Sequence, residues 1–453
     1  MFFVMPRSTD VFSIVSILLV LVFSQPVHAF TQAEKASNKA AQIKILACSF
    51  EKELPDRKAP SGKIFVVCET EWQNIHPKQK VGKDKLEGNV DRTMGVGGFA
   101  GGKKEKNIEY VDMDVAYKVR KLQDHVYLMA DGIAFALHDS TEKIPGGYRM
   151  DEPFTIATQG ESKQVKFVFL IPEGKENMAL QMFDYSFGHV TLPVQGSLKE
   201  ARMSGEASGK ILGHAKTDKV DLAAHALDFQ SEYSGKSAPD GWRYAVVKFS
   251  GKSLSGGNIQ DIVQFKPEEY FWLTTDGGYL YYCSASSTAL DGLVRFTPEI
   301  YQYQELAFLV PESANNFKIG IRVQNQVLHL DLTDKPLVEM PRAIATHKDG
   351  DVMEIMLLGM RREKGKTIAD LGIRSLYDRG GLEIQIKKQF FLLTGNKENK
   401  IDNKTTATLL HQPPKPFVIP PGESVRFELA FDTAEDAVSL RFRGYRGEGE
   451  LKL

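Results

Sequence analysis

The sequence has few cysteines, no excess of charge of either sign and one long apolar run. Three cysteines among 453 residues permit at most one disulfide. Lys and Arg total 57 against 58 for Asp and Glu, so no electrostatic drive toward nucleic acid or anionic lipid is expected. The apolar fraction of 42% is ordinary, and this length is typical of about three domains, each able to bury a core.

Motifs for catalysis are also lacking. No Gly-x-Ser-x-Gly elbow occurs in a strand-turn-helix setting, and the acidic residues suggest no particular pair for hydrolysis. The basic cluster Arg361–Lys366 has no interleaved aromatic residues, so a nucleic-acid face is not indicated. The sequence therefore predicts a non-enzymatic protein, with no catalytic residues and no cofactor.

The N-terminus has the pattern of an export signal. Arg7 precedes an apolar run from Val11 to Phe23, and Val27 and Ala29 are small residues at the −3 and −1 positions of a cleavage site. Residues 1–29 are therefore predicted to be a signal peptide, with an uncleaved anchor as the alternative. No second apolar stretch reaches spanning length. We expect a periplasmic or extracellular protein with no stable membrane span after cleavage.

Two of the cysteines lie on segments that are predicted to be neighbouring strands. Cys48 and Cys68 are 20 residues apart, and a disulfide closing such a loop stabilises by about 3 kcal/mol where its geometry fits. Two buried thiols are the alternative. Cys283, in Tyr281-Tyr-Cys283, is expected in a core.

A closing block recurs three times along the chain. Each copy begins with an apolar strand, and a polar turn and a hairpin follow it. The three strands are Phe167–Pro172, Leu306–Pro311 and Phe427–Asp432. A second landmark precedes each block: an aromatic strand that turns near Gly132, Gly277 and Gly395, with Asp-Gly turn chemistry in the first two. The glycines are 145 and 118 residues apart and the block ends 139 and 121, so the two landmarks agree on a domain-sized period.

These landmarks predict the domain organisation. Short strands at roughly 8–12-residue spacing, with few amphipathic helix patterns, favour antiparallel sandwiches. We expect an all-β protein of three tandem immunoglobulin-like antiparallel β-sandwich domains. The predicted segments, in order, are the modules 40–196, 220–334 and 342–453, with a linker at 197–219.

The first module carries an insertion near residues 78–106. This stretch is rich in Gly and Lys, and a surface loop is expected because loops of this kind often carry binding residues. A phosphate cradle is the alternative, but a strand-like segment follows where that motif needs a helix. The candidate binding residues are Met94, Phe99, Lys103 and Lys104.

Two groups of residues carry the side chains of metal ligands without the full pattern of a metal site. His125 and His138 flank the first hairpin, but two imidazoles without a third ligand do not make a zinc or copper site. Asp112 and Asp114 share a strand face, with Asp124 and Asp131 downstream, yet the spacing of a known calcium loop is absent. No metal site is therefore predicted.

The order of elements within each module resembles a known family. The motifs are Tyr127–Phe135 with Phe167–Pro172, Phe271–Tyr279 with Phe308–Pro311, and Phe390–Gly395 with Pro421–Phe427. They resemble the telokin-like, immunoglobulin-type domains of exported bacterial proteins of unknown function, a group that includes the mycobacterial immunoprotective extracellular antigen. The resemblance implies export and a two-sheet sandwich, and it supplies no catalytic residues, since fold alone does not give function.

The predicted function is non-enzymatic binding of a protein or a glycan in the cell envelope or the extracellular space. The leader and the recurring modules favour it. A metal-binding or hydrolytic protein with a site at a module junction, and an architectural spacer, remain as alternatives.

Overall fold

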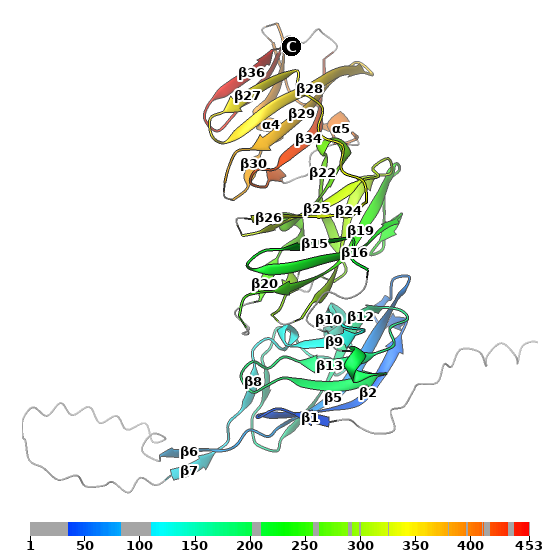
Figure 1. The fold of residues 1–453 in the computed structure, drawn as a ribbon, viewed down its shortest axis with the longest axis vertical. Coiled ribbons are helices and arrows are strands. Elements are labelled where there is room, and N and C mark those ends of the chain that lie inside the picture. Colours follow the sequence, from blue (N-terminus) through cyan, green and yellow to red (C-terminus); the bar gives the residue numbers. More distant parts are fainter. Residues whose placement is uncertain are drawn as a thin grey trace, which may run out of the picture. The chain divides into compact units, whose positions relative to one another are not determined.

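The computed structural model shows an all-β protein (Figure 1). It describes residues 35–82, 110–201, 210–256, 262–288, 292–298, 300–324, 326–378, 380–395, 397–409, 411, 417–433 and 439–452. Nearly all sheet pairings are antiparallel, and the helices among these residues are single turns. The predicted all-β class is therefore confirmed. None of the helices in the described part of the chain is long and apolar enough to cross a membrane.

The chain divides into two compact units. The N-terminal unit comprises Met1–Arg120 and Ser140–Ile171, and the C-terminal unit comprises Lys121–Asp139 and Pro172–Leu453. This division does not test the three predicted modules, which stay a prediction. Each unit is described by itself.

The main sheet of the N-terminal unit has four strands. In sheet order they are β1 (Lys35–Ser37), β2 (Ala41–Glu51), β5 (Lys63–Asn74) and β12 (Ser162–Pro172). Buried and half-buried residues alternate along β5, as expected for a strand with one face on a core. Trp72 on this strand is fully buried, and its ring lies 5.2 Å from that of Phe154 and 6.2 Å from that of Phe167. Trp72 therefore belongs to the core of this unit.

Small ribbons complete this unit. They are β3 (Glu53–Leu54) with β4 (Arg57–Lys58), β6 (Gln79–Gly82) with β7 (Tyr110–Met113), and β8 (Tyr117–Val119) with β11 (Phe154–Ile156). The one-turn helix η2 spans Asp139–Lys143.

The C-terminal unit begins with four strands at one end of a twelve-stranded sheet. Their order is β14 (Val190–Gln195), β13 (Met178–Met182), β9 (Val126–Ala130) and β10 (Ile133–Ala136), and β10 pairs in parallel with β24 (Gln302–Pro311). The predicted hairpin is confirmed, since Asp131 and Gly132 join β9 to β10 with φ values of 44° and 79°. Positive φ at both turn residues is what a two-residue hairpin turn of type I′ requires, and Gly adopts it without strain.

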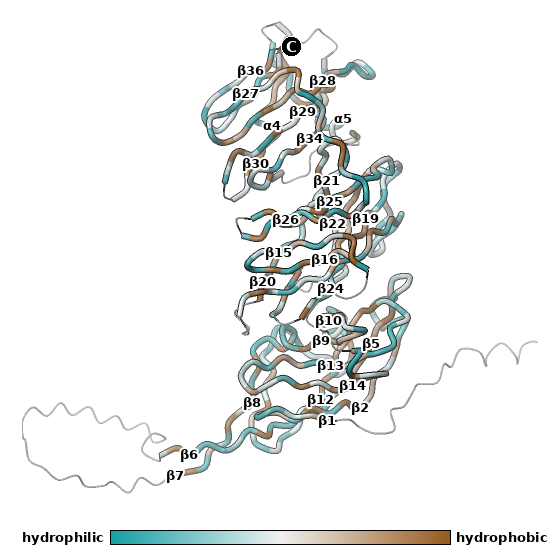
Figure 2. Tube along the Cα trace, viewed as in Figure 1, coloured by the Kyte–Doolittle hydropathy of each residue, from teal (hydrophilic) through white to brown (hydrophobic). Residues whose placement is uncertain are grey.

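Residues 213–331 form the central sandwich. One sheet contains β15 (Gly213–Lys216), β16 (Val220–Gln230), β19 (Trp242–Ser253) and β24 (Gln302–Pro311). The other contains β22 (Leu280–Ser286), β21 (Phe271–Thr275), β25 (Phe317–Val323) and β26 (Gln326–Asp331). The two sheets are joined at one edge, where β22 pairs with β24. Residues of both sheets fill one core. Figure 2 shows stretches of apolar residues along the strands of this sandwich. Strand β15 lies inside the stretch predicted as a linker.

Residues 345–452 form the C-terminal sandwich. Its first sheet contains β27 (Ala345–Asp349), β28 (Met353–Glu363), β29 (Lys366–Ser375) and β34 (Ser424–Phe431). Its second contains β32 (Lys397–Asn399), β31 (Phe390–Thr394), β35 (Ser439–Arg443) and β36 (Glu448–Lys452). Trp272 and Leu280 of the central sandwich join the core between these sheets, so the two sandwiches share apolar packing.

Shorter elements connect these sheets. The ribbons are β17 (Glu232–Tyr233) with β18 (Lys236–Ser237), β20 (Val263–Phe265) with β23 (Val294–Phe296), and β30 (Leu382–Ile384) with β33 (Phe417–Ile419). The helical turns are η1 (Leu122–Asp124), α2 (Leu198–Ala201), α3 (Pro267–Tyr270), η4 (Asp276–Gly278), α4 (Ile386–Gln389) and α5 (Asn403–Thr406).

Candidate functional site

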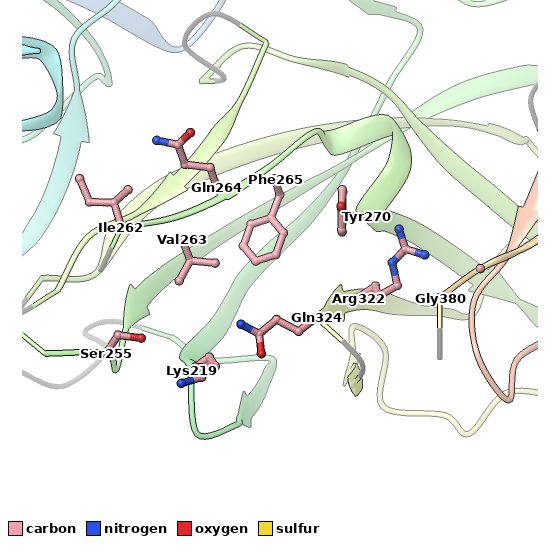
Figure 3. Close-up of a pocket in the computed structure, with 11 residues that line it drawn as sticks. Lys219, Ser255, Ile262, Val263, Gln264, Phe265, Tyr270, Arg322, Gln324 and Gly380 are labelled. Atoms are coloured by element: carbon pink, nitrogen blue, oxygen red, sulfur yellow. The ribbon is translucent and has the colours of Figure 1, made fainter. Parts of the chain in front are cut away.

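A cavity of about 650 Å³ opens in the C-terminal unit, between the central sandwich and the turn that precedes β30. Eleven residues line it, and they come from six separate stretches of the chain (Figure 3). Its volume lies in the range of small-molecule sites in proteins, about 300–1,000 Å³. We take this cavity as the candidate site because aromatic, cationic and amide side chains converge on it.

One wall of the cavity is apolar. In the view of Figure 3 the side chains of Val263, Phe265 and Tyr270 follow one another along it. Phe265 is buried in the central core, and its ring lies 5.6 Å from that of Tyr270 in an edge-on arrangement. Helix α3 begins with Pro267, whose fixed φ suits a first helical position, and this single turn brings Tyr270 back over the wall.

Arg322 supplies a cation beside this wall. Its neighbours Ile321 and Val323 on β25 point into the core, so Arg322 lies on the opposite face of the strand. Its guanidinium carbon lies 4.7 Å from the centre of the Tyr270 ring, a cation–π contact. Among the described residues, no carboxylate oxygen lies within 4.0 Å of a nitrogen of Arg322, so this guanidinium forms no ion pair with them.

Gly381 makes room for this guanidinium. A Cβ at position 381 would lie 2.9 Å from Nη1 of Arg322 and 2.4 Å from a methyl carbon of Val418. Both distances are shorter than real Cβ contacts. The absence of a side chain at Gly381 therefore allows Arg322 to lie where it does.

The remaining polar groups are a second cation, two amides and a hydroxyl. Lys219 comes from the turn before β16, and its ammonium is 3.9 Å from Asp218, whose side chain is 69% exposed. Gln264 and Gln324 offer amides that both donate and accept, and Ser255 offers a hydroxyl. None of the eleven lining residues is Asp, Glu or His. The cavity can therefore bind a polar ligand, and the described residues that line it supply no carboxylate or imidazole for acid–base catalysis.

The binding residues predicted from the sequence lie elsewhere. Met94, Phe99, Lys103 and Lys104 are outside the described residues, so the structure does not test them. It does show the strands at the two ends of that stretch, since β6 and β7 pair from Gln79 with Met113 to Gly82 with Tyr110.

The two cysteines of the predicted disulfide are brought together. Cys48 and Cys68 are register partners on β2 and β5, both are buried, and their sulfur atoms are 2.7 Å apart. They are free thiols here. Cys283 is buried in the central core, as predicted, and burial raises the pKa of its thiol to about 12.

His125 and His138, the two histidines beside the first hairpin, have protein partners. Nδ1 of His125 lies 2.6 Å from the carbonyl oxygen of Phe183, and Nδ1 of His138 lies 3.3 Å from a carboxylate oxygen of Asp139. Among the described residues, no group of three or more His, Cys, Asp and Glu side chains is arranged to hold a metal ion.

Three of the four carboxylates also have protein partners, while Asp112 is exposed on β7. Asp124 pairs with Arg295, Asp131 accepts from the backbone N–H of Asn177, and Asp114 pairs with Lys78.

Sequence reasoning missed every residue of the cavity. Lys219 and Gly381 are far apart in the chain and meet through tertiary packing. Arg322 alternates with apolar neighbours, which is the ordinary pattern of a strand with one wet face. Pro267 after Lys266 was an available signal for the helical turn that places Tyr270.

Comparison with known proteins adds little. No family model matches the chain, and no curated protein matches it. Among solved structures, an uncharacterised β-sandwich protein from Clostridium difficile 630 is 11% identical over 28% of this chain and 99% of its own, with a TM-score of 0.20. A likeness at that TM-score carries no argument about this chain.

Proposed function

We propose that this protein is an exported, non-enzymatic, multi-domain β-sandwich protein that binds a glycan in the cell envelope or the extracellular space. The cavity beside Phe265, Tyr270 and Arg322 is the proposed binding site. Export is proposed from the pattern of residues 1–29, which lie outside the described residues. N-terminal sequencing of the protein from the envelope or the medium is expected to begin at Phe30.

The observation that carries the glycan proposal is the composition of the cavity. A sugar presents apolar C–H faces and a rim of hydroxyl groups, and the cavity offers an apolar wall together with amides and cations. Side-chain amides suit hydroxyl groups because they donate and accept hydrogen bonds. Binding is favoured over hydrolysis because the lining lacks a carboxylate pair, which glycoside hydrolysis usually requires.

We also propose that the chain carries three copies of one telokin-like, immunoglobulin-type module. The strand orders β1-β2-β5-β12, β15-β16-β19-β24 and β27-β28-β29-β34 support this, since each runs through the same sequence of pairings. A β-bulge supports it further. Strands β2, β16 and β28 are 11 residues long, and the register of each shifts at its sixth residue, Leu46, His225 and Leu358 respectively.

The test is binding of the purified protein to a glycan array that spans neutral and acidic oligosaccharides. Ser255→Trp fills the cavity with an indole, and we expect it to abolish the binding seen with the wild-type protein. Ser237→Trp places the same side chain at an exposed position on β18 that does not line the cavity, and it is expected to bind as the wild type does. Circular dichroism checks that both variants fold.

Two results would contradict this proposal. Equal binding by Ser255→Trp and the wild type would move the site away from the cavity. No binding to any glycan, together with an elongated shape by scattering, would favour the architectural spacer.

A further inference from the structure

We infer that the ligand carries an anionic group, the carboxylate or phosphate of an acidic saccharide, and that this group binds Arg322. The inference rests on the proposed glycan-binding function and names the chemical class of its ligand. It depends on how Arg322 differs from other arginines of the same unit.

Several other arginines of the C-terminal unit, buried or exposed, have protein partners. Arg426 binds Asp370 through two nitrogens at 2.9 and 2.6 Å, Arg361 binds Glu428 through two nitrogens, and Arg295 lies 3.3 Å from Asp124. Arg243, which stacks on Phe229, donates to the carbonyl of Ala314. These contacts offset the cost of taking a charge out of water.

Arg322 packs on an aromatic ring as Arg243 does, but among the described residues neither a carboxylate nor a carbonyl oxygen is its partner. The residue is half-buried, its guanidinium lies over Tyr270, and the missing side chain of Gly381 makes room beside it. A guanidinium presents five N–H donors in a plane, and its edge matches the two oxygens of a carboxylate or phosphate. Stacking on Tyr270 fixes that plane before a ligand arrives, which reduces the entropy lost on binding.

Both charged side chains among the eleven described lining residues are cations. Besides Arg322, the ionisable side chains among the eleven lining residues are those of Lys219 and Tyr270. None of the eleven residues is Asp or Glu. An anion therefore meets two cations and no carboxylate in the lining. A neutral sugar would leave the Arg322 guanidinium without a charged partner, so an acidic sugar is expected to bind more tightly than its neutral derivative.

The experiment compares matched ligands by calorimetry. Trigalacturonate carries carboxylates, and its methyl ester has the same sugar rings without the charge. Glucose 6-phosphate tests phosphate as the source of the anion, and inorganic phosphate tests an anion without a sugar. We expect the wild type to bind the acid or the sugar phosphate about 10-fold or more tightly than the ester, and less tightly as ionic strength rises.

Two variants and one control test whether the preference for the acid depends on Arg322. Arg322→Gln is expected to weaken binding of the acid about 10- to 100-fold and to leave binding of the ester little changed. Gly381→Ala is expected to weaken it as well, because the new methyl group displaces the guanidinium. Arg374→Gln removes an exposed cation that does not line the cavity, and it is expected to bind as the wild type does. Thermal unfolding checks the fold of each variant.

The possible failures can be told apart. Equal affinity of the wild type for the acid and the ester overturns the anion inference while the glycan function stands, and this result needs no variant. Arg322-dependent binding of inorganic phosphate with no binding of any saccharide overturns the glycan function and keeps the anion site. Absence of binding to every ligand overturns both.

Discussion

Cys48 and Cys68 lie directly opposite each other on β2 and β5, with their sulfur atoms 2.7 Å apart. A β-bulge produces this pairing. Ile45 pairs with Thr70, and after Leu46 is skipped the register moves by one residue, so that Cys48 meets Cys68. A continuous ladder would have placed Cys48 opposite Val67.

We predict that the two cysteines form a disulfide in the exported protein. Two thiols lose two electrons and two protons to an oxidant of the disulfide class, such as oxidised glutathione, which leaves as two thiols. Because Cys48 is 5% exposed and Cys68 is fully buried, the exchange is expected during folding, before the sheet closes over them. Titration of the denatured, unreduced protein should then find one free thiol, that of Cys283.

A double variant that fills the same space without sulfur measures how much the Cys48–Cys68 disulfide itself stabilises the fold. At the corresponding position after the bulge, the central sandwich pairs Leu227 with Val247, and the C-terminal sandwich pairs Met360 with Ala369. The double variant Cys48→Leu, Cys68→Val should therefore fold, but with a free energy of unfolding lower by about 3 kcal/mol than that of the oxidised wild type. Three free thiols in protein from an oxidising compartment would contradict the prediction.

Local sequence patterns predicted much of the fold. The hairpins near Gly132, Gly277 and Gly395 and the three closing strands are all present, because turn chemistry and alternation are local signals. The bulges were not predicted, since one extra residue in a strand leaves no clear mark in its composition. The cavity was not predicted either, because Lys219, Arg322 and Gly381 meet only through tertiary packing.

Gly320 is predicted to be intolerant of any side chain. A Cβ at this position on β25 would lie 2.2 Å from the indole of Trp272, which is fully buried in the core that the two sandwiches share. Gly320→Ala should therefore lower the free energy of unfolding by about 1–3 kcal/mol or more, the usual cost of an overpacked core. Urea unfolding followed by tryptophan fluorescence measures the change.

Gly359 supplies the control for this substitution. It follows the bulge in β28, and a Cβ there meets nothing within 4 Å. Gly359→Ala is expected to change the free energy of unfolding by no more than about 0.5 kcal/mol. Equal effects of the two substitutions would show that Gly320 does not pack against Trp272 as described.

His411 is predicted to make stability depend on pH. Burial lowers its pKa below the ordinary value of 6.5, while its ring stacks on Tyr279 at 3.6 Å and its Nδ1 lies 2.8 Å from the hydroxyl of Tyr281. The unfolded chain therefore binds a proton below pH 6.5 that the folded chain does not yet bind. This stabilisation is complete above that pH and is lost as the pH falls, at up to about 1.4 kcal/mol per pH unit.

Unfolding measured between about pH 7.5 and about pH 5.5 tests this prediction. His411→Gln keeps a hydrogen-bonding group beside Tyr281 but does not titrate, so its free energy of unfolding should fall less steeply over that range. Burial also lowers the pKa of His225, and His225→Gln should act in the same direction. The prediction would be contradicted if the free energy of unfolding of both variants fell with pH as steeply as that of the wild type.

Calorimetric titration of the wild type and of Arg322→Gln with trigalacturonate and with its methyl ester tests the central claim most directly. We predict that the wild type binds the acid about 10-fold or more tightly than the ester, and that Arg322→Gln largely removes this preference. Wild-type protein that binds neither ligand, and no other acidic saccharide, would contradict the account.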